Sequence, residues 1–364
     1  AKPTRLKTRL TSRHAAAGVP GCAKKRQSET GVAILPKWDS AMFFKGGLSN
    51  PTRDCDVCFI YPFISLNKGI VMLNTPVKSL AGLLLLAGFS APTFAADEAP
   101  ATMAAPEFTY VTTATLASDN IFRGQSQTWG KPALMLGFEV DHKSGLYAGI
   151  AGANVSDHWL PGAHVEVDYY GGYRDTLPGA ASVIAYDVGM IYYTYPGANW
   201  DDSDFAGTKS NSLNTAEAYV ALTYQWLTFK TGRTLNEYWG WNTNNSPVGS
   251  GFAGDPSAGV TGNTRGSYFY ELNANYALGE STWSLIGQAG RQVIHNSTGL
   301  DISYYKAGVN KSFDGGWSVA AAYSWTSDPD AYKDFLSLRN GSRNPNSDSD
   351  IAKDTFLVSV TKAF

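Results

Sequence analysis

The chain has 364 residues, of which 43% are hydrophobic, 13% are aromatic and only 16% are charged. Soluble domains carry about 25% charged residues, so this composition argues against a pair of ordinary soluble domains. Only one run, near residue 80, could be mistaken for the stretch of ~20 apolar residues that a membrane-spanning helix needs, which excludes a polytopic helical membrane protein. The apolar surface must therefore be separated from the polar surface by alternation along the chain.

The N-terminal part of the sequence differs in kind from the rest. Residues 1–71 contain twelve Lys and Arg against four Asp and Glu, hold all three cysteines, and show no sustained periodicity. Residues 72–95 have the layout of a secretory signal peptide, with an initiator methionine, a short basic region, an apolar core at 80–89 and a small-residue cleavage site after Ala95. We therefore expect residues 1–71 to be a disordered upstream extension that the native protein lacks, and residues 72–95 to be cleaved.

The remaining chain begins with an Ala- and Pro-rich segment, residues 96–106, which we expect to be a disordered lead-in. Residues 96–364 contain no cysteine and carry sixteen Lys and Arg against twenty-seven Asp and Glu. This acidic balance argues against nucleic acid as a partner.

From residue 107 onward, apolar and polar side chains alternate with a period of two, which predicts strands that each bury one face. Val165 and Val167, for example, alternate with Glu166 and Asp168. Most runs have the ~9–11 residues that a tilted strand needs to cross a bilayer. The strands are predicted at residues 107–117, 133–142, 145–154, 164–174, 182–193, 215–224, 227–234, 267–278, 282–293, 302–312, 316–326 and 353–364.

The connections between these strands alternate in length. Every odd-numbered connection is longer than every even-numbered one, from the long 194–214 and 235–266 to the two-residue turns at 143–144 and 225–226. Loops sorted in this way are typical of outer-membrane barrels, and aromatic residues at both ends of the outward faces point the same way. The sequence therefore predicts an all-β fold, a single closed antiparallel transmembrane β-barrel of about twelve strands over residues 107–364, in a bacterial outer membrane.

Several segments resemble the TorF porin family. The most specific is Ser118-Asp119-Asn120-Ile121-Phe122-Arg123-Gly124-Gln125-Ser126-Gln127-Thr128, in the first long loop. Similar segments follow at 145–149, 165–173, 187–197 and 217–219. The resemblance implies an outer-membrane β-barrel of porin type, and it implies no particular substrate.

If the apolar faces meet lipid, the opposite faces line the barrel interior. Ten charged residues then point inward and are candidates for lining a pore: Glu139, Asp141, Glu166, Asp168, Asp187, Glu217, Glu271, Lys230, Lys306 and Arg174. Buried charges must be paired or hydrated, so two interpretations remain open. The interior is either a plug held by ion pairs or a narrow, wet, net-acidic passage that concentrates cations. Inward glycines such as Gly149 and Gly189 favour the passage, because they thin its lining.

The first long loop offers two further candidates, Arg123 and Gln127, which could fold inward and constrict the barrel. The alternative is that this loop packs on the rim.

No nucleophile elbow, phosphate-binding loop or zinc-protease motif stands out in the sequence, so we expect no enzyme activity, no cofactor and no metal. The sequence favours a porin-like channel for passive diffusion of small hydrophilic solutes, cationic or neutral. The alternatives are a non-conducting barrel with a structural or adhesive role for its loops, and, third, an outer-membrane enzyme. The expected partners are small solutes, outer-membrane lipid and lipopolysaccharide, and the outer-membrane assembly machinery, which would read the C-terminal Phe364.

Overall fold

The computed structural model describes residues 106–179, 183–203, 212–250, 252, 254–327, 330–339 and 349–364. The predictions for residues 1–71, for the signal peptide at 72–95 and for nearly all of the lead-in at 96–106 lie outside the described residues. Within the described ranges, no helix combines the length and the apolar character that crossing a membrane requires.

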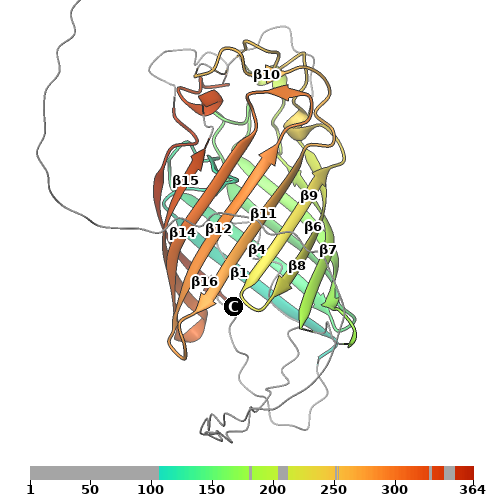
Figure 1. Ribbon diagram of the computed structural model, residues 1–364, viewed down its shortest axis with the longest axis vertical. Coiled ribbons are helices and arrows are strands. Elements are labelled where there is room, and N and C mark those ends of the chain that lie inside the picture. Colours follow the sequence, from blue (N-terminus) through green and yellow to red (C-terminus); the bar gives the residue numbers. More distant parts are fainter. Residues whose placement is uncertain are drawn as a thin grey trace, which may run out of the picture. The chain divides into compact units, whose positions relative to one another are not determined.

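Twelve strands form a closed antiparallel barrel (Figure 1), and each lies within two residues of its predicted limits. Each barrel strand pairs with the barrel strands that precede and follow it in the chain, and the barrel closes where β1 pairs with β16. The predicted fold is therefore confirmed. The barrel strands are β1 (Phe108–Ala117), β4 (Ala133–His142), β5 (Leu146–Asn154), β6 (Val165–Thr176), β7 (Ile184–Thr194), β8 (Thr215–Tyr224), β9 (Leu227–Thr234), β11 (Tyr268–Ala277), β12 (Trp283–Val293), β14 (Ile302–Phe313), β15 (Trp317–Ser327) and β16 (Thr355–Ala363).

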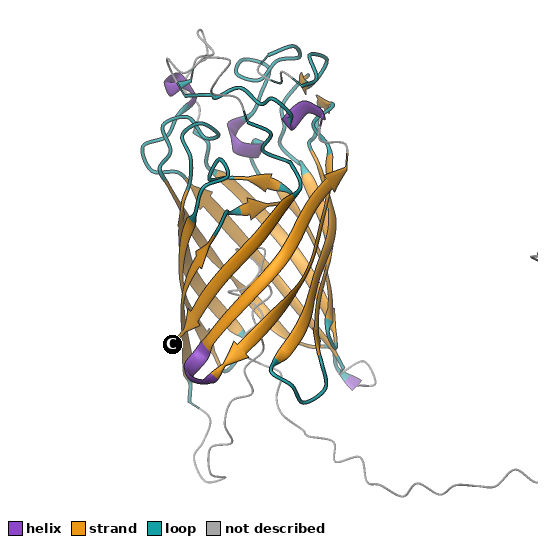
Figure 2. Cartoon of the chain, turned by 90° about the vertical axis from the view of Figure 1, so that its left-hand side faces the viewer, coloured by secondary structure: helices purple, strands orange, loops and turns teal. Residues whose placement is uncertain are grey.

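The long connections all lie at one end of the barrel, which we call the loop end, and the short ones lie at the opposite, turn end (Figure 2). Short elements decorate the loop end: the hairpins β2 (Ile121–Phe122) with β3 (Gln125–Ser126) and β10 (Gly259–Val260) with β13 (Ser297–Thr298), and the 3-10 helices η2 (Trp200–Asp202), η3 (Tyr238–Gly240) and η5 (Asp330–Tyr332). One further 3-10 helix, η4 (Asp314–Gly316), forms a turn at the other end.

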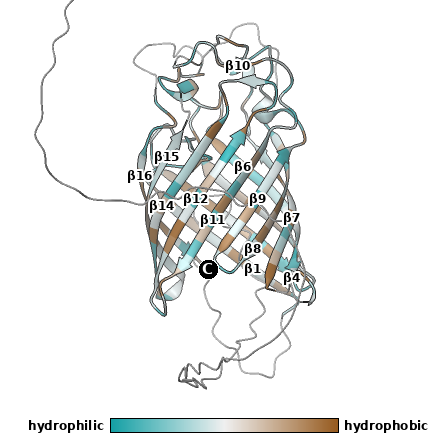
Figure 3. Cartoon of the chain, in the orientation of Figure 1, coloured by the Kyte–Doolittle hydropathy of each residue, from teal (hydrophilic) through white to brown (hydrophobic). Residues whose placement is uncertain are grey.

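The barrel wall has its apolar side chains outside and its polar side chains inside. On β4, Leu134 and Leu136 are 52% and 54% exposed, whereas Glu139 and Asp141 are 1% and 6% exposed. The same alternation of hydrophobic and hydrophilic residues follows most strands (Figure 3). Such a distribution is stable only if the outer wall faces hydrocarbon, as it does in a membrane-spanning barrel.

Aromatic and cationic side chains meet at the turn end. Trp317 begins β15 on the outer wall and is 48% exposed. The Lys362 ammonium lies 4.8 Å from the ring of Phe364 and donates to the carbonyl of Gly315. A lysine that extends along apolar surface to place its charge among aromatic rings suits the boundary between lipid and water.

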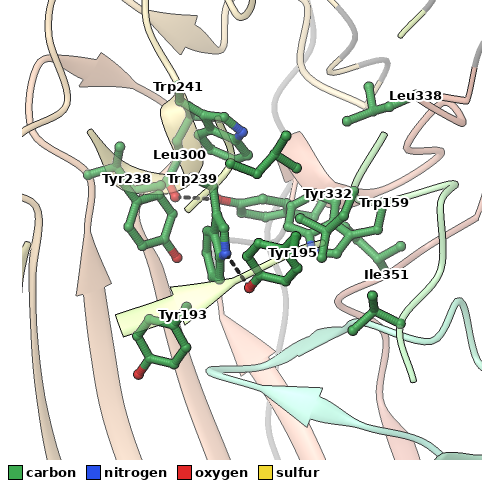
Figure 4. Packing of buried hydrophobic residues seen from close by; sticks show 14 of the residues in the cluster. Trp159, Tyr193, Tyr195, Tyr238, Trp239, Trp241, Leu300, Tyr332, Leu338 and Ile351 are labelled. Carbon is green, nitrogen blue, oxygen red and sulfur yellow. Dashed lines mark hydrogen bonds between the residues drawn. The ribbon is translucent and has the colours of Figure 1, made fainter. Parts of the chain in front are cut away.

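The loop end carries a packed apolar layer, which we call the aromatic cap. It consists of Val155, Trp159, Leu160, Tyr195, Trp200, Leu213, Tyr238, Trp239, Trp241, Phe252, Ala258, Val260, Ile294, Leu300, Ala331, Tyr332, Phe335, Leu338, Ile351 and Ala352. Two of its polar side chains bond within the layer (Figure 4): the Trp239 indole donates to the Tyr195 hydroxyl at 2.6 Å, and the Tyr332 hydroxyl donates to the carbonyl of Leu300 at 2.6 Å. The long loops therefore pack on one another and do not project as separate arms.

Three inward glycines, Gly149, Gly189 and Gly290, do not widen the interior as the sequence suggested, because tyrosine rings lie over them. An ideal Cβ on Gly149 would lie 2.3 Å from the Tyr170 ring, and one on Gly189 would lie 2.7 Å from the Tyr147 and Tyr219 hydroxyls. A flat ring laid across a glycine on the neighbouring strand restores the packing that the missing side chain would have supplied.

This packing predicts the effect of adding one methyl group. Gly149→Ala should destabilise the barrel by about 1–3 kcal/mol, because its Cβ clashes with the Tyr170 ring. The measurement is the midpoint of denaturant-induced unfolding in detergent. Gly149→Ala combined with Tyr170→Ala should lose less stability than the sum of the two single changes; additive losses would contradict the proposed contact.

Candidate functional site

The charged side chains of the interior form three groups along the wall, and neighbouring groups share residues. The first lies near the turn end, where Arg174 on β6 is 2.8 Å from the Glu139 carboxylate and 3.1 Å from that of Asp141. Its guanidinium also lies 3.7 Å from the centre of the Tyr147 ring. The antiparallel register places Asp187 directly opposite Arg174 on β7. This one arginine therefore compensates several inward carboxylates at once.

A second group links three strands through tyrosine hydroxyls. Tyr147 donates to Asp187 at 2.6 Å and contacts the hydroxyl of Tyr219. The Lys230 ammonium lies 3.9 Å from the Tyr219 ring. These contacts hold β5, β7, β8 and β9 in register from the inside, as a hydrogen-bonded network in a weakly polar interior can do.

A third group lies on β11 and β14, two of the strands that follow β9 around the barrel. Glu271 on β11 accepts a hydrogen bond from Tyr304 at 2.8 Å and one from Asn273 at 3.0 Å. Lys230 is its direct cross-strand partner on β9. Lys306 is also inward and only 5% exposed, on β14. The interior is thus lined by hydroxyl, amide and charged groups on this part of the wall too.

Glu166 and Asp168 differ from the other inward carboxylates. They lie on β6 near the loop end, and they are 6% and 5% exposed. No salt bridge of the described residues involves them, and Glu166 Oε2 and Asp168 Oδ1 have no protein hydrogen-bond partner there. Buried polar atoms require partners, so water is the natural partner for these two oxygens.

The β2–β3 hairpin lies inside the loop end of the barrel. Its turn residues, Arg123 and Gly124, have φ angles of 47° and 83°, the left-handed backbone of a tight two-residue hairpin turn. Glycine adopts this backbone freely, and a Cβ at Gly124 would lie 2.7 Å from Thr326 and 2.8 Å from Tyr304 on the barrel wall. The chain can therefore approach β14 and β15 this closely only with glycine at position 124.

Arg123 fastens the hairpin tip to the wall. Its guanidinium donates two hydrogen bonds to Glu217 on β8, at 2.7 and 3.0 Å, and one to Gln292 on β12 at 2.7 Å. It also stacks 3.6 Å from the centre of the Phe269 ring. A bidentate pair between an arginine and a carboxylate is the strongest type of side-chain hydrogen bonding, and burial makes it stronger. A non-glycine residue held in a left-handed backbone beside such a pair is a strained, over-determined site.

The rest of the hairpin is held by its own side chains. Asp119 accepts hydrogen bonds from Ser126 at 2.8 Å and from Thr128 at 2.6 Å. Burial raises the pKa of the Asp119 carboxyl, and these hydrogen bonds act against that rise. Gln127, by contrast, does not reach the wall: it is 2% exposed and accepts from Asn120 at 3.3 Å within the same loop. Arg123 therefore crosses the interior, whereas Gln127 stays in the hairpin's own framework.

The structure also assigns roles to residues that sequence reasoning passed over. Gln292 and Phe269 complete the arginine contact, and Tyr147 and Tyr219 carry the central hydrogen bonds. The alternation along each strand showed that these side chains point inward, but nothing in the sequence indicated which part of the wall the hairpin would contact.

The family comparison concerns the part of the chain that contains this interior. A family model described as "Bacterial protein of unknown function (Gcw_chp)" matches residues 101–364. The chain belongs to the Gcw_chp family. No curated protein matches the sequence.

Solved outer-membrane proteins resemble this Gcw_chp member at low identity. The KdgM porin in complex with disordered oligogalacturonate is 8% identical over 70% of this chain and 99% of that chain, with a TM-score of 0.38. The COG4313 outer membrane channel from Pseudomonas putida F1 is 11% identical over 74% of this chain and 100% of that chain, with a TM-score of 0.38. Both TM-scores and both identities are too low for a solute or a mechanism to be transferred from these proteins to this chain.

Proposed function

We propose that the barrel is an outer-membrane channel of porin type, narrowed by the β2–β3 hairpin, that passes small hydrophilic solutes and prefers cations or neutral molecules. The observation that carries this proposal is the polar, net-acidic interior of a barrel whose outer wall is apolar. Seven inward carboxylates face four inward basic side chains, Arg123 on the hairpin included. An excess of negative charge in a narrow, weakly polar passage raises the local concentration of cations and repels anions.

The unpartnered carboxylate oxygens support a hydrated interior. Polar atoms of Glu166, Asp168, Arg174 and Asp187 are buried without a protein partner. A plug held only by protein contacts would leave these atoms at a cost of about 1–3 kcal/mol each, whereas water in a passage satisfies them.

A second candidate function is a non-conducting barrel, and it is favoured by a different observation. Arg123 is paired with Glu217, Arg174 is paired with Glu139, and the aromatic cap covers the loop end. In that case the barrel would act through its packed loops. We propose no enzymatic reaction for either form.

Ion conductance separates these two functions. The purified barrel in a planar bilayer should conduct, and its reversal potential in a salt gradient should show cation preference. A barrel that inserts, as shown by its protease protection and heat-dependent migration, but gives no conductance at any voltage would support the non-conducting form.

Three further expectations belong to this proposal. The resemblance to the TorF porin family supports a channel. Its most specific matching segment contains the β2–β3 hairpin, which contacts the wall and narrows the proposed passage. Phe364 is 73% exposed at the turn end, where the assembly machinery could read it. Lipid and lipopolysaccharide are expected around the outer wall.

A further inference from the structure

The outer wall contains a hollow of about 1100 Å³ that crosses β5 to β9 and reaches β11. It exists because outward positions in one row carry small side chains: Gly171 on β6 and Ala218 on β8. The register joins Gly171 to Met190, Met190 to Ala218, Ala218 to Arg233, and Arg233 to Tyr268. Leu146, Tyr173 and Val220 stand along its sides.

The hollow runs obliquely toward the loop end. A row of paired residues crosses the strands at right angles, and barrel strands are tilted by about 35–45°, so the row climbs the wall. Gly171 lies in the middle of β6, whereas Arg233 is the last residue but one of β9 and Tyr268 is the first of β11. Four strand spacings of ~4.8 Å give a length of about 19 Å along the hollow, which at this tilt is a rise of about 11–13 Å, against ~15 Å for one leaflet of the hydrocarbon core.

A cation stands at the upper end of this apolar hollow. Arg233 points outward and is exposed, and its Nε donates to the carbonyl of Gly266 at 3.2 Å, which directs the guanidinium along the rim. No salt bridge of the described residues involves Arg233. Arg291, the outward arginine on β12 at the same end, differs, because it lies 3.4 Å from the Asp301 carboxylate. Arg233 is therefore the one of the two that presents its charge to an outside group.

We propose that the hollow binds one acyl chain of an outer-leaflet lipopolysaccharide, with a phosphate of its lipid part on Arg233. This inference rests on the proposed outer-membrane location, which makes the loop end the outer-leaflet side. The hollow rises through most of one leaflet, a flexible chain fills an apolar channel in the wall, and a guanidinium matches a phosphate in charge and geometry. A second copy of the barrel fits less well, since two convex walls meeting at a hollow would leave it empty.

The test measures binding of purified lipopolysaccharide to the full barrel in nanodiscs of neutral phospholipid, by native mass spectrometry and by displacement of a labelled lipopolysaccharide. Arg233→Ala, which removes the charge, and Ala218→Phe, which fills the hollow, should each weaken binding about tenfold. Arg291→Ala and Ala307→Phe are the matched controls, because both lie outward but outside the hollow, and they should change binding less than twofold. Dephosphorylated lipopolysaccharide should be insensitive to Arg233→Ala.

Two results would overturn the inference. Equal losses in the hollow variants and their controls would show that lipopolysaccharide binds elsewhere on the wall. Dissociation of an oligomer by Ala218→Phe, seen by sedimentation, would assign the hollow to a second copy of the chain. Conductance is recorded for the same variants and should stay unchanged, because all four positions face away from the interior; the channel proposal can therefore fail while the lipid site stands, or the reverse.

Discussion

Arg123→Ala is expected to raise the single-channel conductance severalfold. The change leaves Glu217 buried without its cation, and an uncompensated buried charge costs about 3–5 kcal/mol. The barrel can avoid that cost by releasing the hairpin, so that water reaches Glu217. The passage then loses the side chains that now cross it at β8 and β12. Conductance in planar bilayers measures the effect.

The double variant Arg123→Ala with Glu217→Ala distinguishes a latch from a general loss of structure. Both charges are absent, so the double variant should lose less thermal stability than the sum of the losses in the two single variants. Arg291→Ala serves as the control, since it removes an arginine from the outer wall without touching the hairpin. Wild-type conductance in Arg123→Ala, together with faster hydrogen exchange in residues 119–130, would mean that the hairpin moves without obstructing the passage.

Glu166→Gln combined with Asp168→Asn is expected to lower the permeability ratio of cations to anions by at least about fivefold. A unit charge acting on an ion about 4 Å away in water contributes about 1 kcal/mol, and the two amides keep the shape of the side chains they replace. These two carboxylates are chosen because no basic side chain of the described residues forms a salt bridge with them. Replacement of both by lysine should reverse the preference. The reversal potential in a salt gradient is the measurement.

Glu280→Gln combined with Asp314→Asn is the matched control for this selectivity change. It removes two negative charges from exposed turns outside the interior, so its permeability ratio should stay close to that of the native barrel. Equal shifts in both double variants would mean that overall charge, and not the lining at β6, sets the preference. No shift in either would remove Glu166 and Asp168 from the passage.

The strand pattern predicted the barrel closely because the outer face of the wall meets lipid, whereas the inner face meets polar groups. A one-residue slip would turn Leu134 and Leu136 inward and Glu139 outward into lipid, so both register and strand limits are strongly specified by local residue type. The short connections add the order of the strands, since a turn of two or three residues can only join antiparallel neighbours. The inward side of each charged residue follows from the same alternation.

The pairing of those inward charges could not be read from the strands. Alternation places Arg174 inward but does not say which inward carboxylates lie at its level. The structure pairs it with Glu139 and Asp141, two strands away on β4, because strand tilt and stagger decide which inward positions share a level. Glycines were misread for a related reason. Their inward position was right, but the rings that cover them come from neighbouring strands, whose relative level the sequence leaves undetermined.

Alternation of residue type was thus sufficient to predict the barrel and to assign side chains to its inside and its outside, since burial in lipid acts on each side chain separately. Contacts that join distant segments required the folded barrel: Arg123 meets Glu217 and Gln292 only when β8 and β12 face the first loop across the interior. The aromatic cap also depends on contacts between distant segments. Its loops mix polar and apolar residues without a regular period. Their packing depends on three-dimensional proximity at one rim, and no local pattern encodes that proximity.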